Sequence, residues 1–459
     1  ELRLADPMTG AVTDVYREAT DTYYESGFSS ANWRVLPARN EFIWFSEKDN
    51  WGHLYLRDLQ TGALKQQITS GNWAVLDVLK VDTDNDWIYF LGSNREAGDP
   101  YFHYLYRVKF DGSGLSNLTP ELAHHVINWQ QGADYFTDTY STPVAAPASV
   151  IRSTDGEIVL QLEQASTDAL LAAGWVPPIP FTVKARDQQT DLYGLMYKPS
   201  NFDASRHYPV LNYLYPGPQT GSVGSRGFRA SRNDKQALAE LGFIVVEVDA
   251  MGTPGRSKSL HDAYYGDMGD NGLPDQVSAI RQLAAANSWM DLDRVGIWGH
   301  SGGGYASTAG ILRYPDFYKV AVSGAGNHDN RNYEDDWGEK WQGLLVTYPE
   351  TDPVEGENAA TTRATNYDNQ ANQLLAANLK GQLLLAHGLM DDNVHPSNTL
   401  LVVDALIKAD KDFDLLLLPN ASHGFGNGRY FTKKRWDYFV RHLQGVEPPA
   451  DFNFADNFK

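Results

Sequence analysis

One serine of the chain lies in a sequence context that favours nucleophilic chemistry. Ser301 is the centre of Gly299-His300-Ser301-Gly302-Gly303, a G-x-S-x-G pattern that follows the apolar stretch RVGIWGH and precedes the helical stretch GYASTAGILRYP. This strand–turn–helix context is typical of a nucleophile elbow, a tight turn that lifts the serine hydroxyl clear of the sheet. The flanking glycines avoid the clash that larger side chains would cause in such a turn. We expect the Gly302 backbone N–H to point at a developing oxyanion.

A serine nucleophile needs a general base, and the base needs an acid that orients it. In hydrolases with this elbow the chain order is serine, acid, histidine, and each residue lies on a loop after a strand. Two later loops have this form: QLLLAHGLMDDNVHP delivers Asp391 and Asp392, and FDLLLLPNASHGFG delivers His423. We predict Ser301 as the nucleophile and His423 as the base. The spacing alone leaves the acid open between the two aspartates.

Four other histidines are interpreted as structural or pocket-lining side chains: His300, His328, His387 and His395. No H-E-x-x-H pattern or other metal-ligand spacing is present in the sequence, so no metal site is predicted. The glycines of GTPG (252–255) follow a strand but lack a phosphate-binding signature, and we interpret them as a turn. No cofactor is expected.

The residues after Phe181 alternate between strand and helix patterns, which predicts an α/β domain with a mostly parallel sheet covered by helices on both faces. Apolar strand candidates are YPVLNYLY, FIVVEVD, RVGIWGH, KVAVSGAG, QLLLAHG and FDLLLLP, and stretches with helical periodicity separate several of them. The proline-rich GWVPPIP (174–180) marks the start of this half. We predict a hydrolase domain over residues 176–446 and a C-terminal tail over 447–459.

The first half has a different rhythm, with short alternating strands separated by Asp, Asn and Gly turns. Residues 41–69 form one such unit, and looser versions return at 86–119 and 133–162. Repetition on this scale favours the blades of a β-propeller over residues 1–175, and the alternative is an irregular β domain. The opening ELRLADPMTG has no signal-peptide pattern. It suggests a chain that starts partway into a domain, as a fragment, a processed form or a shortened homologue would.

Composition narrows the set of partners. The 459 residues carry a formal net charge of −20, which repels nucleic acid backbones and anionic lipid surfaces, so neither is expected as a partner. The chain has no cysteine, which excludes disulfides and a cysteine nucleophile. No apolar run is long enough to span a bilayer.

Several motifs together resemble the prolyl oligopeptidase superfamily and, within it, the dipeptidyl peptidase IV branch of serine peptidases. They are YLYPGP, FIVVEVDAMGTPGRS, GIWGHSGGGYAS, LLLAHGLMDDNVHP and ASHGF, with SEKDNWGHLYLRDLQTG similar to a late propeller blade of that branch. The resemblance implies an α/β-hydrolase domain preceded by part of a propeller. It selects Asp391 as the acid of the triad, with Ser301 and His423.

The resemblance also implies roles around the triad. Tyr215 in YPGP would share the oxyanion hole with Gly302, and Asn393 and Val394 would contact substrate near the scissile bond. Two aromatic residues, Tyr333 and Trp337, would form the wall of an S1 pocket that favours proline. Simple core packing is the alternative interpretation of these two.

The implied function is a serine exopeptidase that hydrolyses short peptides and releases N-terminal dipeptides of the Xaa-Pro or Xaa-Ala type. A broader acylaminoacyl peptidase or esterase, and a non-catalytic binding module, are the alternatives. Three departures from the family pattern bear on specificity. Gly302 stands where a bulky tyrosine is common, and the segment AGNHDNRNYEDDWGE differs from the segment that usually builds the wall of S1. The paired glutamates that bind a substrate's free amino terminus are not placed in this sequence. The resemblance further implies a periplasmic or secreted protein and dimerisation through the hydrolase domain.

Overall fold

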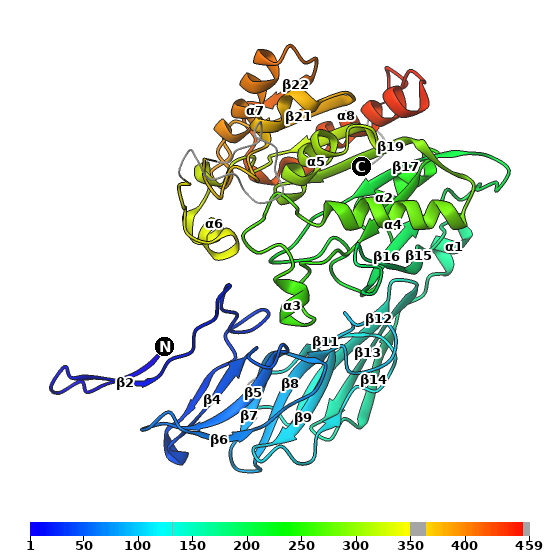
Figure 1. Ribbon diagram of the computed structural model, residues 1–459. Helices are drawn as coiled ribbons and strands as arrows, with labels where there is room; N and C mark the ends of the chain where they lie inside the picture. Colours follow the sequence, from blue (N-terminus) through cyan, green and yellow to red (C-terminus); the bar gives the residue numbers. More distant parts are fainter. Residues whose placement is uncertain (131, 349–363, 453–459) are drawn as a thin grey trace. The chain divides into compact units, whose positions relative to one another are not determined.

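The chain packs as two compact units (Figure 1). The computed structural model describes residues 1–130, 132–348 and 364–452. Unit 1 consists of Glu1–Ala169 with two later segments, Ser225–Arg229 and Pro254–Ala263, and unit 2 consists of the rest. The domain limits predicted from sequence stay predictions. Of the tail predicted over 447–459, residues 453–459 lie outside the described residues.

Unit 1 contains three four-stranded antiparallel sheets, each built from consecutive strands as in the blades of a propeller. A separate hairpin, β1–β2, precedes them. The strands are β1 Leu2–Ala5 and β2 Val12–Tyr16; β3 Arg34–Leu36, β4 Glu41–Ser46, β5 His53–Asp58 and β6 Leu64–Gln67; β7 Ala74–Asp82, β8 Trp87–Ser93, β9 Tyr104–Lys109 and β10 Ser116–Asn117; and β11 His124–Asn128, β12 Tyr135–Thr142, β13 Ala145–Ser153 and β14 Ile158–Gln164. This architecture confirms the predicted propeller-like fold.

The two-residue period of a strand explains why these sheets stack. In β8, Ile88 and Phe90 belong to one apolar cluster, while Tyr89 between them belongs to another. Both faces of the strand are therefore buried, as a blade between two neighbours requires. The sequence units at 41–69, 86–119 and 133–162 start one strand late, because the first strand of each sheet lies before them.

Unit 2 is built on an eight-stranded sheet with the order β15-β16-β18-β17-β19-β20-β21-β22. The pairs from β18 and β17 through to β22 are parallel, whereas β15 and β16 are antiparallel to their neighbours. The strands are β15 Ile179–Lys184, β16 Asp191–Tyr197, β17 Tyr208–Tyr213, β18 Ile244–Val248, β19 Met290–His300, β20 Tyr318–Gly324, β21 Gln382–Gly388 and β22 Asp414–Leu418. The predicted α/β-hydrolase class is confirmed.

Two hydrophobic cores cover the two faces of this sheet. Helices α4, α5 and α7 contribute to one core, and α2 and α8 contribute to the other. The helices are α1 Asp168–Ala172, α2 Lys235–Glu240, α3 Lys258–His261, α4 Leu273–Ala286, α5 Gly302–Arg313, α6 Asp335–Gln342, α7 Ser397–Lys408 and α8 Arg429–Phe439, with short helices η1 Pro37–Arg39, η2 Asn330–Asn332, η4 Asn372–Asn378, η5 His423–Asn427 and η6 Val440–Gln444. In the described residues, every helix is too short or too polar to cross a bilayer.

Candidate active site

Ser301 occupies the sharp turn between β19 and α5. Its backbone has φ 59° and ψ −123°, a strained conformation for a residue with a side chain. Its N–H donates to the Gly324 carbonyl at 2.8 Å, and its carbonyl accepts from the Tyr305 N–H at 2.9 Å. A Cβ on Gly303 would lie 2.4 Å from the Leu214 carbonyl oxygen, so the turn tolerates only glycine there. The local sequence therefore forces the elbow that the motif predicts.

His423 and Asp391 meet through a direct hydrogen bond. His423 begins η5 after β22, and its Nδ1 donates to Asp391 Oδ2 at 2.8 Å. Asp391 is only 4% exposed, whereas Asp392 is exposed. The second carboxylate oxygen of Asp391 accepts the backbone N–H groups of Asn393 at 3.1 Å and Val394 at 2.9 Å. With its proton on Nδ1, the imidazole keeps a lone pair on Nε2, the form that a general base requires.

The residue before the elbow serine fixes the backbone of His423. His300 donates from Nε2 to the His423 carbonyl at 2.6 Å, and the two rings lie 5.1 Å apart at their centroids. Burial lowers the pKa of His300 to about 4, so its ring is neutral at neutral pH. No hydrogen bond joins the Ser301 hydroxyl to His423 in the described part of the chain. Such bonds commonly tighten only when substrate is bound.

Tyr215 and Gly302, the two residues predicted for the oxyanion hole, lie side by side. A Cβ on Gly302 would stand 3.6 Å from Cζ of Tyr215 and 3.8 Å from its hydroxyl oxygen. Gln219 donates from Nε2 to that oxygen at 3.1 Å, which leaves the hydroxyl proton available to another acceptor. Gln219 was missed by the sequence analysis, since an amide four residues after a tyrosine has no recognisable pattern.

A pocket of about 280 Å³ adjoins the candidate base. Aromatic and imidazole rings line it, including Tyr215, His300 and His423. At its floor, Arg435 of α8 donates to Asp234 at 2.6 Å and to the Gly426 carbonyl at 3.2 Å. Burial opposes the ionisation of Asp234, but Arg435 outweighs it and the pKa of Asp234 is lowered. The ion pair ties α8 to the start of α2, and the hydrogen bond to Gly426 ties α8 to η5, the segment that begins at His423.

The predicted S1 residues also come together. The Tyr333 and Trp337 rings lie 5.5 Å apart in an edge-to-face arrangement. Burial raises the pKa of Tyr333 to about 12, and its hydroxyl donates to Asn393 Oδ1 at 3.4 Å. Val394 is completely buried, its N–H donates to Asp391 and its carbonyl oxygen accepts from His387, so its predicted contact with substrate stays a prediction.

Buried amides lie beneath this aromatic pair. Asn330 donates from Nδ2 to Gln342 at 3.0 Å and from its backbone N–H to Gln370 at 2.7 Å. The three side chains are each at most 2% exposed. Hydrogen bonds among buried amides fix a loop more specifically than apolar contacts do, since each lost bond leaves an unsatisfied group.

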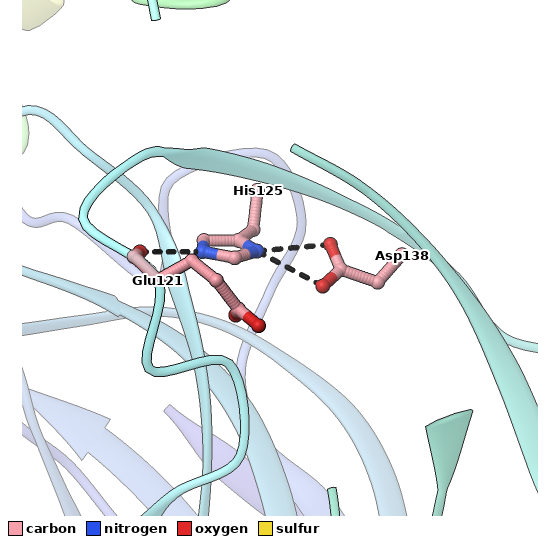
Figure 2. A group of neighbouring side chains, drawn as sticks. All are labelled: Glu121, His125 and Asp138. Atoms are coloured by element: carbon pink, nitrogen blue, oxygen red, sulfur yellow. Dashed lines mark hydrogen bonds and ion pairs between the residues drawn. The ribbon is translucent and has the colours of Figure 1, made fainter. Parts of the chain in front are cut away.

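One cluster of acidic and imidazole side chains, in unit 1, has the composition of a metal site. Figure 2 shows His125 between the Asp138 carboxylate and the Glu121 carbonyl, with hydrogen bonds of 2.9 Å to the carboxylate and 3.0 Å to the carbonyl. Arg152 supplies the positive charge, since it donates to Asp138 at 2.9 Å and to Glu121 at 2.7 Å. The cluster therefore does not fit a metal ion.

The sheet order and the elbow place unit 2 among the α/β-hydrolases that carry a nucleophile elbow. Comparison with known families makes this specific. Residues 229–446 match the prolyl oligopeptidase family, and residues 1–147 match the N-terminal region of dipeptidyl peptidase IV. The chain belongs to the prolyl oligopeptidase family of serine peptidases, in its dipeptidyl peptidase IV branch.

Individual relatives agree with this assignment. Human dipeptidyl peptidase 8 is 29% identical over 92% of the chain and 49% of its own length. Mouse prolyl endopeptidase FAP is 28% identical over 84% of the chain and 49% of its own length. The crystal structure of Porphyromonas gingivalis dipeptidyl peptidase 4 matches with a TM-score of 0.82 and 25% identity, over 96% of the chain and 60% of that structure. The chain thus spans about half the length of these curated relatives.

Proposed function

We propose that this chain carries the catalytic machinery of a serine exopeptidase that hydrolyses short peptides and releases N-terminal dipeptides. The observation that carries the proposal is the buried Asp391 carboxylate hydrogen-bonded to Nδ1 of His423, in the same hydrolase unit as the Ser301 elbow. Relatives named as dipeptidyl peptidases support the exopeptidase class.

The proposed reaction proceeds through an acyl-enzyme. The Ser301 oxygen bonds to the scissile carbonyl carbon while its proton passes to Nε2 of His423. The π-electron pair moves to the carbonyl oxygen, which the Gly302 N–H and the Tyr215 hydroxyl stabilise. Asp391 keeps the imidazole in the required tautomer and stabilises the imidazolium.

Collapse of this tetrahedral intermediate breaks the C–N bond. His423 gives its proton to the leaving amine, and the dipeptide remains esterified to Ser301. Water then adds to the ester, His423 accepts the proton of that water, and the carbonyl oxygen becomes an oxyanion again. When the second intermediate collapses, Ser301 regains a proton and the dipeptide leaves as an acid.

Specificity for Xaa-Pro or Xaa-Ala substrates is proposed from the Tyr333–Trp337 pair, because flat aromatic faces suit a pyrrolidine ring. Gly302 favours the broader alternative, an acylaminoacyl peptidase or esterase. A Cβ on Gly302 would lie 3.6 Å from Cζ of Tyr215. Because glycine has no Cβ, the space beside the Tyr215 ring stays open. A non-catalytic binding module has no comparable observation in its favour.

Chromogenic substrates separate these alternatives. The proposal expects turnover of free-amino Gly-Pro and Ala-Ala substrates, none of amino-blocked Gly-Pro, and none by Ser301→Ala. Equal turnover of blocked and free substrates would support the broader acyl hydrolase instead. No turnover of any of them by the wild-type protein would contradict both.

We also propose a homodimer and a periplasmic or secreted location. Large apolar side chains are exposed on α7 and on the edge strand β22, including Ile407 at 65% and Leu417 at 38%, which supports association through the hydrolase unit. Light scattering of the purified chain checks the dimer, and fractionation of the cells that produce it checks the location.

A further inference from the structure

His387 is a buried histidine that the proposed mechanism does not use. It is the penultimate residue of strand β21, and its side chain is completely buried. Nε2 lies 2.8 Å from the Val394 carbonyl oxygen and 3.3 Å from Asp391 Oδ2. Nδ1 lies 2.7 Å from the hydroxyl oxygen of Thr399, in α7. One ring thus contacts both ends of the loop that carries the proposed triad acid.

These contacts determine the protonation state of the ring. A carbonyl and a carboxylate can only accept, so Nε2 must carry a proton that both share. The Thr399 hydroxyl is able to donate, so Nδ1 can be unprotonated and accept from it. Burial lowers the pKa of His387, in agreement with a neutral ring. The titratable groups that act on it are Asp391, His423 and His328.

We propose that His387 is a positioning residue for the triad acid, holding the Asp391 carboxylate and the following loop so that Oδ2 stays on Nδ1 of His423. The proposal rests on the proposed function, since it needs Asp391 to act on a catalytic His423.

A neutral donor suits this position better than a cation. Asp391 must keep its full negative charge to stabilise the imidazolium of His423 during the reaction. A lysine or arginine next to it would compensate that charge, whereas a neutral imidazole supplies a hydrogen bond without doing so. The two backbone N–H groups that donate to Oδ1 of Asp391 likewise supply hydrogen bonds without compensating its charge.

The substitution His387→Leu removes the donor and keeps an apolar side chain in the site. A carboxylate displaced by about an ångström is expected to lower kcat about 100-fold. KM is expected to stay close to the wild-type value, because His387 touches no substrate. The acid limb of the kcat/KM profile should move to lower pH, because a carboxylate displaced from His423 stabilises its imidazolium less.

The substitution His387→Gln tests the hydrogen bonds directly, because its amide both donates and accepts. It should restore most of the kcat lost in His387→Leu and return the acid limb towards its wild-type position. Thr399→Val should cost about fivefold in kcat, the equivalent of one neutral hydrogen bond. His395→Gln is the matched control. His395 is an exposed histidine of the same segment that bonds to Ser397, and its replacement should leave kcat and the pH profile unchanged.

Fluorophosphonate labelling of Ser301 in the wild-type protein is measured first, so that the two proposals fail separately. No labelling would overturn the proposed function and this inference together. With labelling present, a His387→Leu variant with wild-type kcat and pH profile would overturn the positioning role alone. So would a His387→Gln variant as impaired as His387→Leu.

The tautomer is measured on the wild-type protein, which avoids dependence on variants that fold. Nitrogen-15 spectra of histidine-labelled protein should show a protonated Nε2 and an unprotonated Nδ1 for His387. The opposite tautomer would contradict the proposal.

Discussion

Tyr215 shows which properties of a single residue follow from the sequence and which need the structure. The resemblance suggests its role, and the structure adds that its ring borders the Gly302 position and that Gln219 donates to its hydroxyl oxygen. Neither contact has a sequence signal. Hydrogen bonds between side chains depend on tertiary packing, so the contact of Gln219 could not be predicted, and His387 was interpreted only as a structural or pocket-lining side chain. Ser301 and His423 were within reach, because each follows an apolar strand in the expected order.

Replacing Tyr215 by phenylalanine should lower kcat by about 100-fold to 1,000-fold with little change in KM, since the hydroxyl acts on charge that develops only in the transition state. Steady-state kinetics on an Ala-Ala substrate measure this. Gln219→Leu is the control for hydroxyl orientation and should lose less than Tyr215→Phe. A Tyr215→Phe variant with wild-type kcat would exclude the tyrosine from the oxyanion hole.

His328 makes stability depend on pH. It is fully buried, its Nδ1 accepts from Asn372 at 3.0 Å, and burial lowers its pKa from 6.5 to about 3. Below pH 6.5, His328 binds a proton in the unfolded chain but stays neutral in the folded chain. The free energy of unfolding should therefore fall by about 1.4 kcal/mol per pH unit as the pH drops from 6.5 towards 3.

Urea denaturation between pH 7.5 and 5 measures the free energy of unfolding at each pH. The titration of one group predicts that this free energy changes by about 1.4 kcal/mol per pH unit. His328→Gln keeps a hydrogen-bond acceptor for Asn372 and cannot titrate, so its pH dependence should be flatter by that amount. Equal slopes for the two proteins would show that His328 is protonated to the same extent in both states.

At the scale of elements, the six strands from β17 to β22 were predicted within a few residues at most ends, because each is a short apolar run between polar turns. The antiparallel strands β15 and β16 were not predicted. The blades were harder. Strands β3 and β10 have three and two residues, too few to show alternation, and they pair only because longer neighbours present an edge. The Arg152 network of the third sheet was not anticipated, since its members come from separate strands and a loop.

Arg152 should stabilise that sheet strongly. It is 2% exposed, and its partner Asp138 is completely buried. Arg152→Met would leave the buried carboxylate without its cationic partner and with its hydrogen bond to His125, at a cost of about 3–5 kcal/mol in the free energy of unfolding. Arg3→Met, which breaks an exposed pair with Asp14, is the control and should cost less than about 1 kcal/mol. Chemical denaturation followed by tryptophan fluorescence compares them, and similar losses would refute the network's importance.

At the scale of the whole molecule, the described residues form three propeller-like four-stranded sheets and one eight-stranded hydrolase sheet. The residues proposed for the triad and for the oxyanion hole, and the aromatic pair, all belong to unit 2. The chemistry of acyl transfer is therefore expected to need only unit 2. The proposed release of dipeptides also requires a group that binds a substrate's free amino terminus, so it depends on more than the proposed triad.

The central claim is that Ser301 is a nucleophile activated by His423 and Asp391. It is tested most directly by labelling the intact chain with a fluorophosphonate and locating the adduct by mass spectrometry, with Ser301→Ala, His423→Ala and Asp391→Asn in parallel. The account predicts one adduct, on Ser301, absent in Ser301→Ala and formed far more slowly in the other two variants. An adduct elsewhere, or equal labelling rates in the His423 and Asp391 variants, would contradict it.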